Sequence, residues 1–236
     1  MQDQKQWDKA AEAFRHAFDE HFQPAGAAMR LAQVTAAQGK LDDALHWLQR
    51  AYDVSPTALG ILPKIGGVPQ LEGNAQFAAL MDKAAKAIHP CLAQHESHQF
   101  DFWLGDWTVT NSQDQVVGHN RVTSDLWGCV LREHWASVYG SKGTSVNFYD
   151  PATKHWHQIW TSDIGIITHY EGSFRDGAMR FHANGFGDAN GTTHFRRMTF
   201  TPKKDGSVRQ LIEDSDNGRD WTVSFDGTYR KSEGAH

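Results

Sequence analysis

The residues of this chain that could carry chemistry are polar side chains placed among aromatic ones. In segment 129–137, Glu133 shares a face with Trp135, because alternate residues of a strand point to the same side. By the same rule, Ser145 and Asn147 share a face with a tyrosine, and Gln158 shares a face with two tryptophans. Polar groups among aromatic rings are typical of a ligand pocket with a few orienting hydrogen bonds.

We therefore expect a pocket rather than a hydrated outer face that carries scattered aromatic rings. The alternation assigns its lining to Trp135, Ser145, Asn147, Tyr149, Gln158, Trp160, Glu171 and Arg197. A small-molecule ligand would stack on the aromatic rings and be oriented by the amides, the hydroxyl and the charges.

Two of the charged side chains are candidates for acid–base catalysis, Glu133 and His169. A carboxyl group beside tryptophans has its neutral form favoured, which raises its pKa toward the range of a general acid. Arg197 and Glu213 are explained equally well by an ordinary ion pair between strands. The sequence contains no Ser-His-Asp order, GxSxG motif, P-loop or Rossmann fingerprint.

The hairpin 155–174 decides whether a metal site is also expected. If Gln158 faces His169, the two strands form a mixed polar and aromatic wall, and this is the register we predict. A slip by one residue would instead gather His155, His157 and His169 with Glu171, a donor set that suits a metal ion. Under the favoured register no metal ligands are predicted.

The segment DSDNGRDW at 214–221 begins like a calcium loop. However, Gly218 stands where an oxygen ligand is needed, and Phe225 stands in place of the final glutamate. The segment resembles the Asp-box hairpin turn, with Asp216, Gly218 and Trp221 in place. We therefore expect a structural turn.

Composition excludes several classes of protein. The chain has 236 residues, a formal net charge of −5 and a mean hydropathy of −0.59. An acidic chain is not expected to bind nucleic acid, and no apolar run is long enough to span a membrane. Cys91 and Cys129 could form one disulfide, but two buried thiols are the favoured interpretation. No signal peptide is visible in MQDQKQWDK, and the cellular compartment stays open.

A change of composition near residue 95 predicts two domains, 1–94 and 95–236. The first part is rich in Ala, Leu, Gln and Lys at helical spacing, and the small-large-small pattern of Ala10, Phe14 and Ala17 recurs 34 residues later. Segment 25–57 resembles a tetratricopeptide repeat (TPR). The resemblance implies a region that binds a protein partner or a second copy of the chain. Because repeat arrays usually need about three units and fewer than two are visible here, a helical brace is the alternative.

Helices are expected on both sides of this repeat. The segment before it is interpreted as the second helix of a preceding repeat, and 74–88 as a further helix. The stretch 55–73 between them is rich in Pro and Gly and is predicted to be mostly irregular.

The second part predicts about ten strands with short connections and no helices between them, which is typical of an antiparallel barrel. The expected strands are 102–111, 116–126, 129–138, 144–150, 155–161, 165–174, 178–184, 192–201, 207–214 and 221–230. The fold class is thus α+β, a TPR-like helical region followed by the barrel.

Five ordered motifs support that fold: FDFWLGDWTV, GCVLREHW, GTSVNFYD, WHQIWTSDIG and DGSVRQLIEDSDNGRDW. Together they resemble the lipocalin-like DUF1579 family of the calycin group over about 95–230. The resemblance implies that Trp107 closes one end of the barrel, and it says little about function.

The leading hypothesis is a barrel that binds a small apolar or aromatic molecule. The alternatives are an enzyme using the same pocket for acid–base chemistry as a lyase, isomerase or hydrolase, and an interaction protein with a packed interior. A haem-binding barrel similar to the nitrobindins is a further alternative, by analogy of fold. No cofactor motif is present, and no cofactor is predicted.

Overall fold

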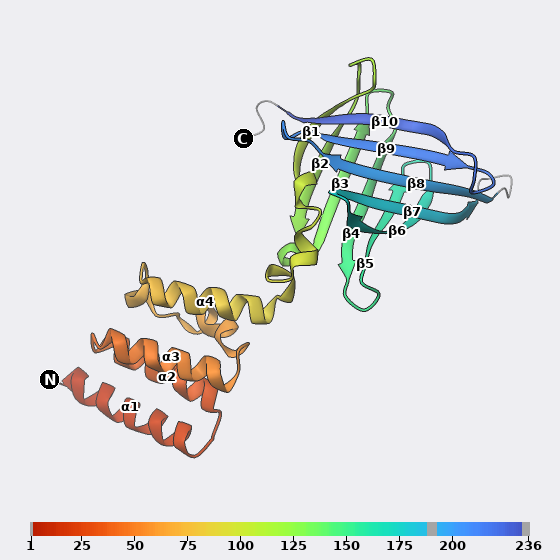
Figure 1. Cartoon of the computed structure of the whole chain (residues 1–236). Helices are drawn as coiled ribbons and strands as arrows, with labels where there is room; N and C mark the ends of the chain where they lie inside the picture. Colours follow the sequence, from red (N-terminus) through yellow and green to blue (C-terminus); the bar gives the residue numbers. More distant parts are fainter. Residues whose placement is uncertain (1, 188–192, 233–236) are drawn as a thin grey trace. The chain divides into compact units, whose positions relative to one another are not determined.

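The computed structural model describes residues 2–187 and 193–232 of the chain. The chain divides into two compact units, Met1–Ala93 and Gln94–His236 (Figure 1). Residue 192, at the start of the predicted strand 192–201, lies outside the described residues. The same holds for residue 1 of the predicted domain 1–94 and for residues 233–236 of the predicted domain 95–236.

The first unit is built from four α-helices. They are α1 (Gln2–Asp19), α2 (Pro24–Ala37), α3 (Leu41–Val54) and α4 (Ala75–Ile88). The predicted helix before the repeat, the helix pair within 25–57 and the helix at 74–88 are confirmed as helices. Asn74 caps the last of these, because its side chain accepts hydrogen bonds from the backbone amides of Gln76 and Phe77.

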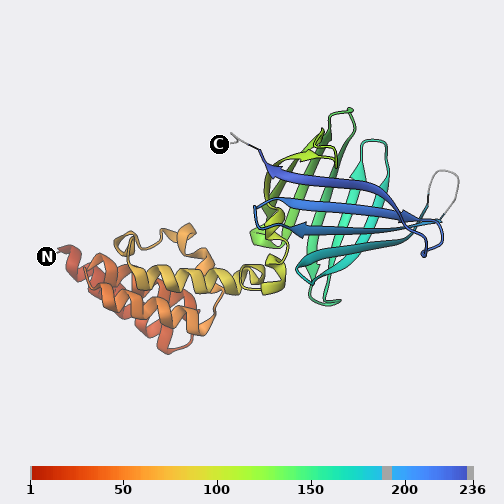
Figure 2. The same ribbon diagram turned by 45° about the horizontal axis from the view of Figure 1, so that its top comes forward.

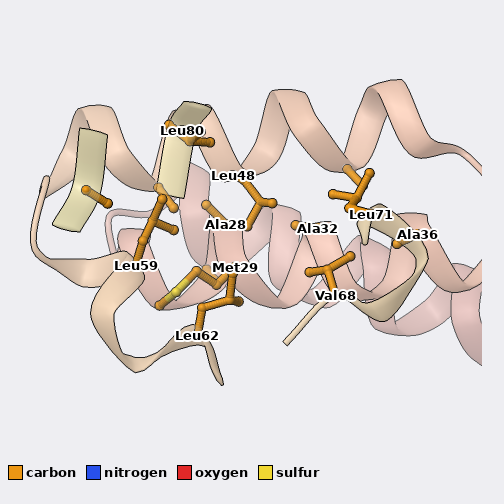
Figure 3. Close-up of a cluster of buried hydrophobic side chains, with 14 of the residues drawn as sticks. Ala28, Met29, Ala32, Ala36, Leu48, Leu59, Leu62, Val68, Leu71 and Leu80 are labelled. Carbon is orange, nitrogen blue, oxygen red and sulfur yellow. The ribbon is translucent and has the colours of Figure 1, made fainter. Parts of the chain in front are cut away.

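Small side chains allow α2 and α3 to pack closely. Ala28, Ala32, Ala44 and Ala51 are fully buried, and Leu48 fills the space between the helices (Figure 3). This is the arrangement expected from the repeated alanines. It does not by itself identify a TPR, which stays a prediction.

The segment between α3 and α4 is more regular than predicted. It forms two 3₁₀ helices, η1 (Ala58–Ile65) and η2 (Pro69–Leu71), which bury Leu59, Leu62 and Leu71 in the apolar core shared with α2, α3 and α4 (Figure 3). Tight 3₁₀ turns tolerate the prolines and glycines that suggested an irregular chain. The buried leucines hold the segment in place.

The second unit is a closed antiparallel barrel, as predicted. Three short 3₁₀ helices, η4 (His95–His98), η5 (Asp101–Trp103) and η6 (Leu126–Gly128), accompany its strands. The strands are β1 (Gly105–Thr110), β2 (Val116–Asp125), β3 (Val130–Ser137), β4 (Lys142–Asp150), β5 (His155–Ser162), β6 (Ile167–Arg175), β7 (Ala178–Gly187), β8 (Thr193–Pro202), β9 (Val208–Ser215) and β10 (Thr222–Lys231).

Each strand pairs with its neighbour in sequence, and β1 also pairs with β10, so that the sheet closes (Figures 1 and 2). Trp107 lies opposite Lys231, and Val109 lies opposite Tyr229. Closure removes the two open edges that a ten-strand meander would otherwise present.

Aromatic side chains fill one end of the barrel. Phe100 and Trp103, from the segment that enters β1, stack with ring centroids 4.9 Å apart. Trp107 is buried beside them and donates a hydrogen bond from its indole nitrogen to the backbone oxygen of Trp103. Trp156 and Phe200 complete this apolar end. The remaining interior lies toward the opposite end, where β3 passes into β4.

No helix in the described part of the chain is long and apolar enough to cross a membrane. Cys91 and Cys129 are both disulfide-bonded, so the preference for two buried thiols is wrong.

Candidate functional site

Four polar side chains that were predicted to lie among aromatic residues, Glu133, Ser145, Asn147 and Gln158, point into the barrel. Glu133 on β3 lies opposite Ser145 on β4, and Asn147 on β4 lies opposite Gln158 on β5. All four are buried, with at most 4% of the residue exposed. The alternative of a hydrated outer face is therefore wrong for these residues.

A chain of hydrogen bonds joins the four side chains to one another. The amide of Gln158 donates to Oδ1 of Asn147 over 2.7 Å, and Nδ2 of Asn147 donates to Oγ of Ser145 over 2.9 Å. Ser145 donates in turn to Oε2 of Glu133 over 2.6 Å. From the other side, Nδ2 of Asn120 on β2 donates to Oε1 of Glu133 over 2.9 Å. The Glu133 carboxyl group is thus the acceptor at which the chain ends.

Burial controls the ionisation of this carboxyl group. Loss of solvation raises the pKa of Glu133 from 4.5 to about 7, against the hydrogen bonds from Ser145 and Asn120, which lower it. Neither neighbour is a cation, so no opposite charge supports the ionised form at close range. Glu133 is therefore poised to exchange a proton near neutral pH.

Glu133 lies on the wall of a cavity of about 450 Å³ at the open end of the barrel. The cavity is lined by Val117, Glu133, Trp135, Ser137, Tyr139, Ser141, Arg196, Gln210, Ile212, Ser224, Phe225 and Tyr229. Much of its wall is apolar or aromatic, and hydroxyl groups line it from the β3–β4 connection and from β10. The buried polar groups in the wall are Glu133 on β3, Gln210 on β9 and Tyr229 on β10. No histidine is among the described lining residues, so a histidine axial ligand for haem, as in the haem-binding alternative, is not found in this part of the cavity wall.

A second pair of polar side chains faces Glu133 across the interior. The Tyr229 hydroxyl donates to Oε1 of Gln210 over 2.5 Å, and both residues are buried. Burial, with a smaller contribution from the charge of Glu133, raises the pKa of Tyr229 well above its ordinary value. Tyr229 is therefore a neutral hydrogen-bonding group at all physiological pH values.

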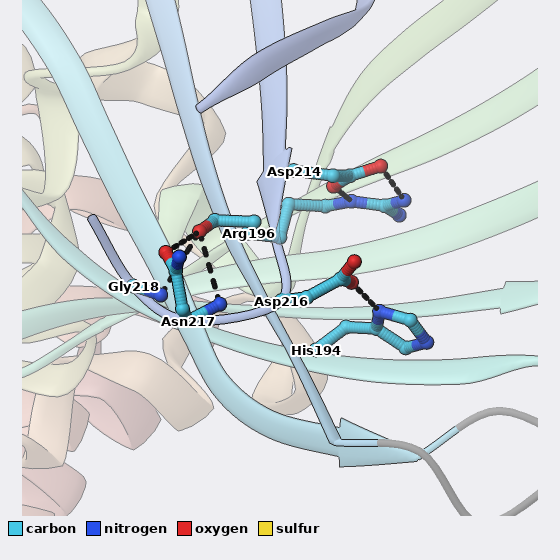
Figure 4. A network of polar contacts seen from close by, with 7 residues as sticks. His194, Arg196, Asp214, Asp216, Asn217 and Gly218 are labelled. Atoms are coloured by element: carbon cyan, nitrogen blue, oxygen red, sulfur yellow. Dashed lines mark hydrogen bonds and ion pairs between the residues drawn. The ribbon is translucent and has the colours of Figure 1, made fainter. Parts of the chain in front are cut away.

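The positive charge of the cavity is held by Arg196 on β8. Its guanidinium forms two bonds to Asp214 on β9, 2.5 Å from Nε to Oδ1 and 2.8 Å from Nη2 to Oδ2 (Figure 4). Burial disfavours the charged guanidinium, but the bonds to Asp214 and Tyr170 outweigh it and leave the pKa of Arg196 raised. The arginine is thus permanently charged and neutralised by its partner.

The turn that follows Asp214 is structural, as its resemblance to an Asp-box suggested. Oγ of Ser215 accepts a hydrogen bond from the amide of Gly218 over 2.9 Å, and Asn217 accepts from the amides that follow it. Asp216 instead contacts Nδ1 of His194 on the neighbouring strand over 2.7 Å (Figure 4). The side chains of this turn are used to join β8 and β9.

Three residues of the predicted site lie on the outside of the barrel: the acid–base candidate His169, and Glu171 and Arg197 of the predicted lining. The predicted hairpin register is wrong, because Gln158 faces Tyr170, and His169 faces Ile159. The one-residue difference places His169 and Glu171 on the outer face of β6. Arg197 also points outward and pairs with Glu213 on β9, as the ion-pair interpretation predicted.

The histidines near this hairpin do not form a metal site. Nδ1 of His155 lies 2.9 Å from a carboxylate oxygen of Glu171, and the His157 ring stacks on Phe148 with centroids 5.4 Å apart. Among the described residues, no group of three His, Cys, Asp or Glu side chains is arranged to hold a metal ion.

Tyr149 and Trp160 lie on the inner face but do not line the cavity. The Tyr149 ring lies 6.2 Å from that of Trp156, in the aromatic part of the barrel. The Trp160 ring lies against Gly143, where an added Cβ atom would come within 2.2 Å of it. Both rings are therefore packing residues, whereas Trp135 borders the cavity directly.

Three buried residues of the interior, Asn120, Gln210 and Tyr229, were not predicted from the sequence. Each could have been found by alternation, because Asn120 lies between the inward Gly118 and Val122, and Gln210 lies two residues after the buried Val208. A polar residue on an otherwise apolar strand face is the signal that was available.

No protein-family model matches the chain, and a search of curated proteins finds no match.

Proposed function

We propose that the barrel binds a small, largely apolar or aromatic molecule in the cavity at its open end. The observation that carries this proposal is a cavity of about 450 Å³ whose apolar walls surround a few buried polar groups. Cavities of this size and composition are typical of small-molecule sites. A barrel interior that served stability alone would gain from apolar side chains at these positions.

The polar groups indicate an uncharged ligand. Arg196 is neutralised by Asp214, and Tyr229 is neutral. Glu133 is neutral below its pKa of about 7. A ligand hydroxyl or amide group would find hydrogen-bonding partners in Glu133 and Gln210, while Trp135 would contact its apolar or aromatic part.

The test uses N-phenyl-1-naphthylamine, a neutral aromatic probe whose fluorescence rises in apolar surroundings. Ile212 lines the cavity, so Ile212→Trp should fill it and weaken probe binding at least about tenfold, since a bulky ring and the probe cannot share the space. Ile159→Trp is the matched control, because Ile159 is 38% exposed on the outer face of β5. Native mass spectrometry of the purified protein would reveal a ligand that is retained.

Two results would contradict the proposal. One is the absence of both probe binding and a retained molecule in the wild-type protein. The other is equal probe affinity in Ile212→Trp and Ile159→Trp, which would place the probe outside the barrel.

A second candidate function is acid–base catalysis in the same cavity. It is favoured by one observation, the carboxyl group of Glu133 with a pKa near 7 at the cavity wall. A molecule identified by native mass spectrometry would be incubated with wild-type protein and with Glu133→Gln. Conversion by the wild type alone would support an enzyme, and conversion by neither would favour the binding protein.

The helical unit is proposed to brace the chain or to mediate association, as its resemblance to a TPR implies. Support comes from apolar side chains exposed on this unit, Trp7 at 42%, Phe22 at 67% and Ile61 at 49%. Light scattering after size exclusion would test self-association. If the protein is a monomer at all accessible concentrations, self-association is excluded, and the helical unit either braces the chain or binds a different protein. The resemblance of the barrel to the DUF1579 family likewise stays a proposal, supported by the closed sheet.

A further inference from the structure

A second concave surface lies on the outside of the barrel, across β7, β8 and β9 and the end of β6. Since alternate residues of each strand point outward, this groove contains none of the cavity residues. It has a volume of about 720 Å³. Its outward-facing residues include Arg175, Arg180, Arg197, Arg209 and Glu213.

The groove carries more positive than negative charge. Its four arginines face a single carboxylate of the lining, Glu213. Glu213 forms an ion pair with Arg197, through two hydrogen bonds of 2.6 and 2.7 Å. Arg209 forms an ion pair with Asp226 on β10, through hydrogen bonds of 2.8 and 2.7 Å. Two of the four arginines are therefore already neutralised by the protein.

The other two arginines, Arg175 and Arg180, form no ion pair with any residue in the described ranges. Nε of Arg180 is enclosed and has no hydrogen-bond partner there. A buried donor without a partner is costly, because it has lost its water and gained nothing in return. An oxyanion in the groove would supply the charge that the protein does not.

We propose that this outer groove binds a small molecule through a phosphate group held by Arg175 and Arg180. Two uncompensated positive charges match the double negative charge of a phosphate monoester. Guanidinium groups recognise phosphate through paired hydrogen bonds, and the hydroxyls of Thr199 and Thr201 add donors of the kind that phosphate oxygens accept. The proposal is independent of the ligand in the barrel cavity.

The experiment is a calorimetric titration of the full-length chain with pyrophosphate. Arg175→Gln removes an exposed charge and should weaken binding about tenfold, the expected loss of one charge-assisted contact. Arg180→Gln should weaken it at least as much. The matched control is Arg121→Gln on β2, whose side chain is 65% exposed and pairs with Asp106 outside the groove. It should change the affinity by no more than about twofold.

A parallel arm separates two sources of phosphate. Sedimentation with phosphatidic-acid vesicles tests a lipid headgroup, whereas pyrophosphate tests a soluble molecule. Binding to vesicles without binding to pyrophosphate would overturn the small-molecule proposal.

The proposal would also be overturned if pyrophosphate failed to bind the wild-type protein, or if Arg121→Gln weakened binding as much as Arg175→Gln. Should Arg180→Gln fail to fold because of its enclosed position, the exposed Arg175 still decides the result. Ile212→Trp, which fills the barrel cavity, should bind pyrophosphate with unchanged affinity, so that failure of one site is distinguished from failure of the other.

Discussion

Replacing Glu133 by glutamine should remove a pH dependence of the barrel's stability. In the folded protein the pKa of Glu133 is raised from 4.5 to about 7 by burial. The folded state therefore holds more protons than the unfolded state between these values, and stability is lost as the pH rises through this interval. This contribution to stability amounts to about 3 kcal/mol; it is fully present below about pH 4.5 and fully lost above about pH 7.

Glutamine can occupy the same place without ionising. If the Asn120 side chain turns over, its Oδ1, which now lacks a partner, can accept a hydrogen bond from the new amide group. Ser145 can still donate to the glutamine oxygen. We therefore expect Glu133→Gln to be no more stable than the wild type near pH 5, to gain on it as the pH rises to about 7, and to change little relative to it from there to pH 8.

The measurement is urea unfolding of both proteins at several pH values from 5 to 8, followed by tryptophan fluorescence. Seven of the nine tryptophans lie in the barrel unit, so the signal reports mainly on its unfolding. The quantity compared is the difference in free energy of unfolding between the two proteins, which cancels the titration of groups they share. A difference that stays constant from pH 5 to 8 would refute the reasoning about Glu133.

Three further outcomes are expected. Ser145→Ala removes a hydrogen bond that lowers the pKa of Glu133, so the loss of stability should shift to higher pH in the same unfolding series, and an unchanged midpoint pH would count against the network. Gly143→Ala places a Cβ atom 2.2 Å from the Trp160 ring and should cost about 1–3 kcal/mol in urea unfolding, whereas an unaltered unfolding curve would show that the ring moves freely. Asn74→Ala should cost about 1 kcal/mol at the start of α4, measured by hydrogen exchange of its first amides, and unchanged protection there would contradict the capping role.

Alternation along single strands was a reliable guide to the barrel interior. Within β3 and β4 it placed Glu133, Ser145 and Asn147 on the inner face without any knowledge of the neighbouring strands, because the period of a strand is fixed by its backbone. The number and antiparallel order of the strands followed from the short connections in the same way.

The register between strands was harder to predict, since it depends on the turn. In the structure the β5–β6 connection has three residues between Ser162 and Ile166, with Gly165 in the left-handed region at φ +81°. This is a three-residue hairpin loop, for which glycine at that position is the usual signal. The predicted register differed from this loop by one residue and therefore placed His169 on the inner face of β6 instead of the outer face.

The contacts across the cavity could not be predicted from single strands. Tyr229 and Glu133 come together only because β10 closes on β1, and Arg196 meets Tyr170 only because β6 and β8 curve around a common interior. Contacts across a barrel depend on its closure, which the sequence of one hairpin does not contain.

The pairing of β1 with β10 has a consequence for how the protein is made. Trp107 and Lys231 are neighbours in the sheet although more than a hundred residues separate them along the chain. During synthesis on the ribosome, the backbone groups on one edge of β1 therefore have no β10 partner until the last strand has emerged. A nascent chain at that stage presents an open strand edge to its surroundings, and chaperones that shield such edges would be expected to influence its yield.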